Sequence, residues 1–178
     1  DITLLGQNVN VFGLDDGGDG TSFPDLLRAV AALPGLRRLR FVTPHPRDFS
    51  PETVRALAEL PVLCPRLHLP LQSGSDSVLA RMGRGYDMAR YLALVADLRA
   101  ARPDLALSTD LIVGFPGESE EEFADTLAAV DAAGFMSSFS FCYSDRPGTR
   151  ASAMPFKVPR EVQLERLERL QALQDRRA

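Results

Sequence analysis

The sequence is poor in cysteine, tryptophan and lysine, and each shortage excludes some classes of protein. Its 178 residues include two cysteines, no tryptophan and a single lysine, Lys157. Cys64 and Cys142 are too few for a disulfide framework or for a metal site made of four thiolates. No apolar run approaches the roughly 18 residues that a membrane helix needs, so we expect no membrane segment and no membrane partner.

Positive charge is also in deficit. The chain has 20 Lys and Arg residues against 24 Asp and Glu residues, which gives a net charge of −4. Nucleic acids bind clustered positive charge, so this balance argues against a surface built wholly to hold them. The hydrophobic fraction of 45% suffices for the core of one domain. The chain starts inside an apolar run without Met, so we expect a piece of a longer protein.

Strand and helix patterns alternate along the chain. Apolar runs predict five strands, at residues 2–5, 39–43, 67–71, 105–113 and 135–143. Capping residues and apolar periodicity predict helices that begin near residues 22, 50, 76, 87, 119 and 159. The glycine- and aspartate-rich residues 13–20 are expected to form a loop.

Two of these elements carry predictions about burial. The uninterrupted apolar residues Leu111, Ile112 and Val113 predict a strand end that is buried on both faces. The last helix carries one stripe of leucines, through which it would pack on the barrel unless it leads into a following domain; the stripe consists of Leu164, Leu167, Leu170 and Leu173.

The alternation predicts an α/β fold with parallel strands and right-handed crossovers. A doubly wound sheet is one form of this fold, but no G-x-G-x-x-G motif follows the first strand. An open or incomplete barrel is the other form. Polar or glycine-rich residues follow every predicted strand, and barrel enzymes build their sites at that rim. We therefore favour the barrel.

Three segments at this rim have residue types suited to a ligand. Gln7 and Asn8 place two carboxamides after the first strand, which suits an amino-acid-like ligand unless they serve only the backbone. Residues 110–119 combine glycines, a proline and a helix N-terminus, which either expose backbone groups to a ligand or form an ordinary turn before a helix. Tyr143 ends the last predicted strand and Arg146 follows it, where an arginine either holds a carboxylate or a phosphate or is simply solvated.

His45 lies between two prolines that stiffen its loop. A histidine in this setting is either a catalytic candidate or, more commonly, a structural residue. The residues taken by themselves therefore indicate a barrel enzyme that binds a small polar ligand.

Six blocks of sequence resemble a known enzyme family. They are GQNVN, HPRDF, HLPLQSGSD, RMGRGY, STDLIVGFPGE and YSDRPGT, and they extend over nearly the whole chain. Together they resemble the methylthiotransferase branch of the radical S-adenosylmethionine (SAM) enzymes, most closely its tRNA-modifying subfamily. The subfamily acting on ribosomal protein S12 tends to have AQD at residues 6–8 and QHAS at residues 72–75, and it is the alternative.

The resemblance implies a fold, a reaction and partners. The fold is expected to be a partial (β/α)6 TIM-like barrel of the radical SAM type, here without its first strand and helix. The implied reaction adds a methylthio group to C2 of N6-isopentenyladenosine at position 37 of tRNA. It uses two 4Fe-4S clusters and SAM as cofactors, with tRNA and SAM as partners, in the cytoplasm.

The resemblance also implies which residues meet the cofactor. By their positions in the blocks they are Gly6, Gln7, Asn8, Gln72, Ser73, Ile112, Val113, Gly114, Tyr143 and Ser144. The first three are expected near the methionyl amino group of SAM, and the next two near its methionyl or ribose part. The strand end at 112–114 is expected to offer backbone groups to the adenine. His45 is the one catalytic candidate.

The family's cluster-binding C-x3-C-x2-C segment has no counterpart in this chain, and the resemblance places it before Asp1. We therefore expect no metal site here and no activity from this chain alone. Residues 1–150 are expected to form the barrel segment, and residues 151–178 an exit segment toward a TRAM domain that grips tRNA. A non-catalytic barrel scaffold is the remaining alternative.

Overall fold

The computed structural model describes residues 1–14 and 20–176, so residues 15–19 of the predicted loop lie outside the described residues. The chain divides into two compact units, Asp1–Pro70 with Ala93–Leu107 and Leu71–Leu92 with Ser108–Ala178. The boundary falls within helix α4 (Met88–Ala101) and strand β4 (Ala106–Val113). Each unit is therefore described separately.

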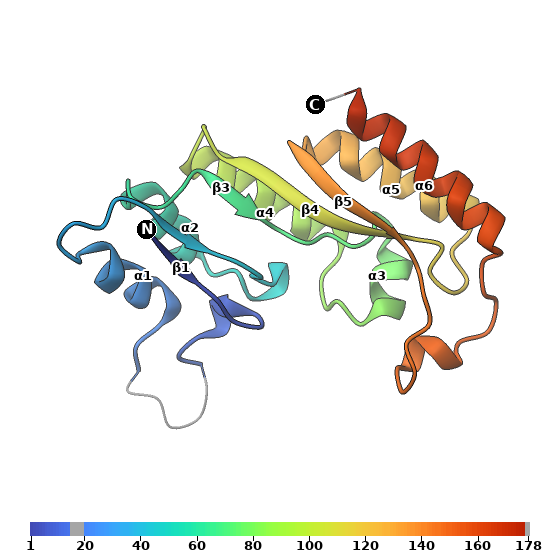
Figure 1. The fold of residues 1–178 in the computed structure, drawn as a ribbon, viewed down its shortest axis with the longest axis horizontal. Coiled ribbons are helices and arrows are strands. Elements are labelled where there is room, and N and C mark those ends of the chain that lie inside the picture. The colour runs from blue at the N-terminus through green and yellow to red at the C-terminus, as the bar shows by residue number, and fades with distance from the viewer. Residues whose placement is uncertain (15–19, 177–178) are drawn as a thin grey trace. The chain divides into compact units, whose positions relative to one another are not determined.

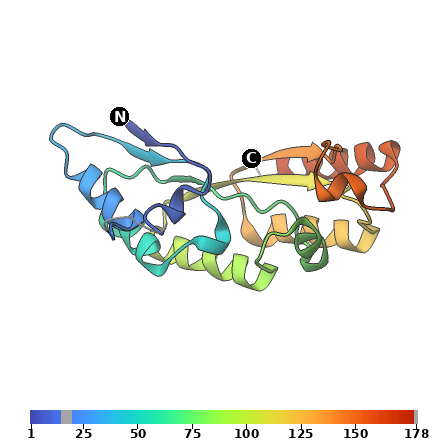
Figure 2. The same cartoon turned by 90° about the horizontal axis from the view of Figure 1, so that it is seen from below.

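The first unit contains a parallel two-stranded sheet. Strand β1 (Ile2–Leu4) pairs with β2 (Leu39–Phe41), and Ile2 stands opposite Leu39. Helices α1 (Phe23–Ala31) and α2 (Pro51–Glu59) lie together on one side of these strands (Figure 2). The short 3-10 helices η1 (Val9–Val11) and η2 (Pro46–Asp48) follow the two strands.

Both helices of this unit begin where their capping residues predict. The Ser22 side chain accepts the backbone N–H of Asp25, and the Asp25 carboxylate accepts the N–H of Ser22, which completes a capping box. Ser50 accepts the N–H of Thr53 in the same way, ahead of a proline at the first helical position. The buried Phe23 ring then meets Phe41 edge-on, with centroids 5.2 Å apart.

The second sheet has the order β3-β4-β5, with β3 at Arg66–His68 and β5 at Ser137–Cys142. Strand β4 runs parallel to β5, and Ile112 stands opposite Phe141. Helices α3 (Asp76–Met82), α5 (Glu120–Ala133) and α6 (Arg160–Asp175) belong to the second unit, and η3 (Arg150–Ala153) precedes α6. Figure 1 shows α6 running alongside α5, next to β5.

The predicted alternation of parallel strands and helices is confirmed. The third strand is shorter than predicted and ends at His68, since Pro70 has no N–H to continue a ladder. None of the helices in residues 1–14 and 20–176 is long and apolar enough to cross a bilayer.

Both burial predictions need correction. Strand β4 buries only every second residue, and Ile112 is half-exposed between the buried Leu111 and Val113, so burial on both faces is wrong. Helix α6 packs through only part of the leucine stripe: Leu170 is buried, whereas Leu164 is 43% exposed. Its buried residues are Gln163, Arg166, Leu170 and Gln174. Three of these four are polar, and their partners are described below.

Candidate functional site

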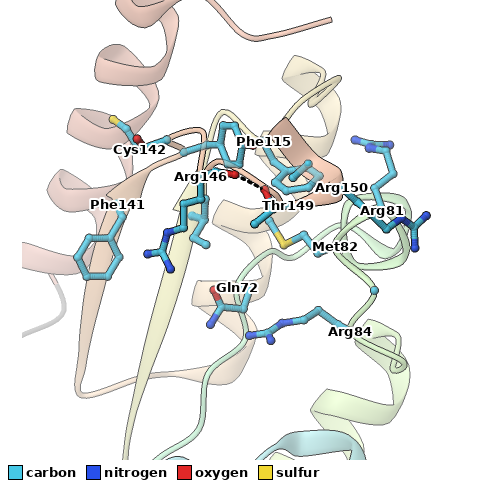
Figure 3. A pocket seen from close by; sticks show the side chains of 15 residues that line it. Gln72, Arg81, Met82, Arg84, Phe115, Phe141, Cys142, Arg146, Thr149 and Arg150 are labelled. Atoms are coloured by element: carbon cyan, nitrogen blue, oxygen red, sulfur yellow. Dashed lines mark hydrogen bonds between the residues drawn. The ribbon is translucent and has the colours of Figure 1, made fainter. Parts of the chain in front are cut away.

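A cavity of about 970 Å³ opens in the second unit, where β4 and β5 end (Figure 3). Four predicted cofactor residues line it: Gln72, Ile112, Tyr143 and Ser144. They come from the segment after β3, from β4 and from the end of β5. The carboxyl ends of neighbouring parallel strands meet at one edge of a sheet. For this reason Ile112 and Tyr143, which lie 40 and 71 residues after Gln72 in the chain, share a cavity with it.

Gln72 is held in an unusual backbone conformation. Its φ of 76° lies in the left-handed region that non-glycine residues rarely adopt. Two hydrogen bonds to β4 fix it there: its N–H donates to the Asp110 carbonyl at 2.8 Å, and its own carbonyl accepts the Ile112 N–H at 2.9 Å. Strained residues of this kind gather at ligand sites. Here the strain belongs to a residue whose amide points into the cavity (Figure 3).

Tyr143 is fixed by polar and aromatic neighbours. Its hydroxyl donates to Asp145 Oδ1 at 2.8 Å, and the Lys157 ammonium lies 5.2 Å from its ring centroid. Phe115 packs against the same ring edge-on at 5.2 Å. The Lys157 ammonium, which also bonds Asp145, lowers the pKa of that carboxyl, and the Tyr143 hydroxyl lowers it further. The tyrosine ring thus forms a rigid wall of the cavity.

The other predicted residues of this unit are engaged within the chain. Ser73 is fully buried, and its hydroxyl lies 3.3 Å from Thr126 Oγ1. Val113 is also buried, and its carbonyl accepts the Tyr143 N–H at 2.8 Å. The Gly114 N–H donates to Glu118 Oε1 at 2.9 Å, and its carbonyl accepts from Gln163 Nε2 at 3.4 Å. At this strand end it is therefore the Ile112 side chain that lines the cavity.

Helix α6 closes over the loop after β4 through buried polar contacts. Arg166 Nη1 pairs with Glu118 Oε1 at 2.8 Å, and the two side chains are 6% and 1% exposed. Burial raises the pKa of the Glu118 carboxyl, against the lowering effects of the Gly114 N–H and Arg166. These contacts explain why α6 buries a polar face, and leucine periodicity gave no signal for them.

Gly6, Gln7, Asn8 and His45 all lie in the first unit. Gly6 and Gln7 are exposed after β1, and the Gly6 carbonyl accepts from the Thr43 hydroxyl. Asn8 is left-handed, with φ 52°, and leads into η1. Their proposed contact with the cofactor stays a prediction.

His45 caps η2 and is held firmly. Its Nδ1 accepts the Arg47 N–H at 3.2 Å and lies 3.9 Å from Asp48 Oδ2. The Asn10 side chain donates to the His45 carbonyl at 3.0 Å and accepts its N–H at 2.8 Å. These contacts describe a structural role, and a catalytic role for His45 stays a prediction.

Within residues 1–14 and 20–176, no three His, Cys, Asp or Glu side chains come close enough to hold a metal ion. The described residues therefore do not fit an iron-sulfur cluster. The cavity does fit a nucleoside-sized group, because aromatic and aliphatic walls from Phe115, Tyr143 and Ile112 stand beside the Gln72 amide.

Comparison with known proteins identifies the family. The family model described as the Radical SAM superfamily matches residues 4–130. The chain belongs to the radical SAM superfamily.

Two relatives of this radical SAM chain share one name. It is 68% identical over 176 residues to the tRNA-2-methylthio-N(6)-dimethylallyladenosine synthase of Nitratidesulfovibrio vulgaris (strain DP4) and covers 39% of that enzyme. It is 56% identical over 178 residues to the synthase of the same name from Lawsonia intracellularis (strain PHE/MN1-00), again covering 39%. The chain thus spans about two fifths of the length of these relatives, and the recognised resemblance to the tRNA-modifying subfamily is confirmed.

A solved structure supports the radical SAM fold. Coproporphyrinogen III oxidase (HemN) from Escherichia coli, described as a radical SAM enzyme, superposes with a TM-score of 0.65 at 21% sequence identity. The match covers 78% of this chain and 32% of that protein. The predicted partial barrel is confirmed at the level of the fold, and the described residues alone form no closed barrel.

Proposed function

We propose that this radical SAM chain is the part of a tRNA methylthiotransferase that binds SAM and presents it to the substrate adenosine. The reaction would add a methylthio group to C2 of N6-isopentenyladenosine at position 37 of tRNA. The observation that carries the proposal is the convergence of Gln72, Ile112, Tyr143 and Ser144 on one cavity, in a chain 68% identical to a synthase of that name. The enzyme is expected to work in the cytoplasm.

The cavity residues suit the parts of SAM. Gln72 offers a donor and an acceptor to a methionyl or ribose group, and its fixed backbone holds the amide in place. Ile112 and the immobilised Tyr143 ring offer apolar contact to a flat adenine. When bound, SAM and the 4Fe-4S clusters supply the radical and sulfur chemistry. This chain's own task is to bind, orient and exclude water, with residues 1–150 as the barrel segment and 151–178 as the exit segment.

The test of the reaction is genetic. The gene for the full-length protein is deleted, and the nucleosides of total tRNA are measured by mass spectrometry. We expect the 2-methylthio group to disappear and N6-isopentenyladenosine to accumulate. Persistence of the methylthiolated nucleoside would contradict the proposal and would turn attention to ribosomal protein S12 or to a non-catalytic scaffold.

The test of the cofactor site is a binding measurement on the reconstituted holoenzyme. Gln72→Ala is expected to raise the Kd for SAM about tenfold, the equivalent of one lost polar contact. Gln171→Ala, an exposed glutamine on α6, is the matched control and should leave the Kd unchanged. Equal affinities in both variants would remove Gln72 from the site.

A further inference from the structure

The cavity wall is strongly basic, although the chain as a whole is acidic. Four arginines line it, Arg81, Arg84, Arg146 and Arg150, and none of its lining residues is Asp or Glu. The whole chain has a net charge of −4. Four guanidinium groups on one cavity of an acidic chain indicate that this surface binds an anion.

Three of these arginines have no carboxylate partner in the part of the chain that the structure describes. Arg81 is committed to Glu122 through two hydrogen bonds, of 3.1 and 2.8 Å. Within residues 1–14 and 20–176, no Asp or Glu forms an ion pair with Arg84, Arg146 or Arg150. In Figure 3 the Arg84 guanidinium points toward the Gln72 amide, and Arg146 projects into the same space.

Arg84 also keeps an unused donor at this place. Its Nε is buried and has no hydrogen-bond partner among the described residues. A buried guanidinium N–H without an acceptor is costly, and an oxyanion bound beside it would remove that cost. Arg146 and Arg150, in contrast, are exposed, so an anion reaches them without displacing any part of the chain.

Exposed aromatic side chains accompany the positive charge. Phe141 lines the cavity and is 54% exposed, and Phe139, two residues earlier on β5, is 59% exposed. Side chains two apart on a strand share a face of the sheet. Guanidinium groups beside open aromatic rings are the combination with which proteins bind single-stranded nucleic acid, through phosphates and stacked bases.

We propose that Arg84, Arg146 and Arg150 bind backbone phosphates of the tRNA anticodon loop, while Phe141 stacks against an unpaired base. This inference rests on the proposed function. It assigns to this chain contacts with RNA that the sequence analysis expected mainly from the TRAM domain. SAM is a poor match for the same arginines. Its sulfonium and ammonium outweigh its single carboxylate, whereas RNA adds one negative charge with every nucleotide.

The test is RNA binding by the reconstituted holoenzyme over a range of salt concentrations. Fluorescence anisotropy follows a labelled anticodon stem-loop that carries N6-isopentenyladenosine. Arg146→Ala with Arg150→Ala is expected to raise the Kd about tenfold near physiological salt. It should also lower the slope of log K against log salt by about 0.7 for each lost single-strand phosphate contact. Both residues are exposed, so the fold should be unaffected.

Matched variants separate charge from other effects. Arg146→Lys with Arg150→Lys keeps the charge and is expected to keep the salt slope. Arg55→Ala removes an arginine of α2 whose side chain is 61% exposed, and should change neither affinity nor slope. Phe141→Ala is expected to weaken binding about tenfold at every salt concentration, because stacking releases no counterions.

The outcomes distinguish the two proposals. An unchanged salt slope in the double alanine variant would overturn the inference. The inference would also be overturned if the double alanine variant lost binding of labelled SAM in equilibrium dialysis but kept its affinity for RNA. That result would assign the arginines to the carboxylate of the cofactor. Arginine-dependent RNA binding by a wild-type enzyme that forms no methylthiolated nucleoside would support the inference and refute the proposed function.

Discussion

Arg166 Nη1 donates both to Glu118 Oε1, at 2.8 Å, and to the Glu118 carbonyl, at 3.1 Å. The same carboxylate oxygen accepts the Gly114 N–H at 2.9 Å. One buried pair therefore ties helix α6 to the loop that ends β4, next to the cavity residue Ile112. The position of this cavity wall depends on a helix that begins more than 40 residues later in the chain.

Arg166→Met is expected to destabilise the fold by about 3–5 kcal/mol, because Glu118 would remain buried without its counter-charge. Arg169→Met is the matched control on the same helix, since its side chain is 40% exposed and pairs with Glu120, which is 53% exposed. That loss should cost about 1 kcal/mol or less. Urea unfolding followed by circular dichroism measures both. Equal costs would show that the buried pair does not hold α6.

Gly114→Ala should be far more harmful than an alanine at another left-handed glycine. Gly114 has φ +72°, and a Cβ there would lie 2.4 Å from Gln163 Cγ. Gly35 has φ +79°, but a Cβ there would meet nothing within 4 Å. Gly35→Ala therefore reports backbone strain alone, about 1 kcal/mol. We expect Gly114→Ala to lower the free energy of unfolding by at least about 1 kcal/mol more than Gly35→Ala does. Adding Gln163→Ala should recover the excess, and no recovery would argue against the clash.

Acid should weaken the contact between α3 and α5. Hydrogen bonds from Arg81 are the main cause that lowers the pKa of Glu122 from 4.5 to about 2. Since the folded-state pKa is the lower one, the carboxylate stabilises the fold above pH 4.5, and this stabilisation is lost as the pH falls toward 2. Glu118, whose pKa is raised by burial, contributes with the opposite sign.

The Glu122 contribution is isolated by comparing variants. In Arg81→Gln the free energy of unfolding should depend less on pH between 4.5 and 2 than in the wild type. Glu118 is unaltered in both proteins, so its contribution cancels in the difference. Parallel pH curves for the two proteins would rule out the Arg81–Glu122 contact as the cause.

The capping box of α5 offers a smaller test. Ser119 accepts the N–H of Glu122 at 3.2 Å, and Glu122 accepts the N–H of Ser119 at 2.9 Å. Ser119→Ala is expected to cost about 1 kcal/mol, and Ser119→Gly only a few tenths, because glycine is tolerated at this position. Thermal unfolding of the two variants checks the order. A glycine variant less stable than the alanine variant would contradict the capping role.

Sequence reasoning was most successful where the determinants are local. The starts of three helices were predicted from their N-cap residues, which are Ser22, Ser50 and Ser119. This was possible because an N-cap side chain accepts a backbone N–H within three residues of its own position. The parallel direction of the strands also followed from alternation alone. The same reasoning identified the buried face of α6 only in part, since Leu170 is buried but Leu164 obeys the helical period and still faces solvent.

The candidate site was predicted in part for the same reason. Residues that end parallel strands share an edge, so Gln72 and Tyr143 could be grouped before their cavity was seen, whereas Ile112 was implied only by the family resemblance. Arg84 could not be grouped with them, because nothing in its own segment shows that its buried Nε lacks a partner. The one signal was the charge in RMGRGY, which served only for recognition.

The sequence by itself determined the alternation of elements, the helix starts and the family, since each depends on residue types at short or fixed spacings. Only the tertiary structure decided that Gly114 is engaged by Glu118 and Gln163. It also decided that α6 buries Arg166, and that three arginines without an ion-pair partner among the described residues share a wall with Gln72. These are contacts between residues far apart in the chain, and burial or pairing of a charge depends on which groups the fold brings beside it.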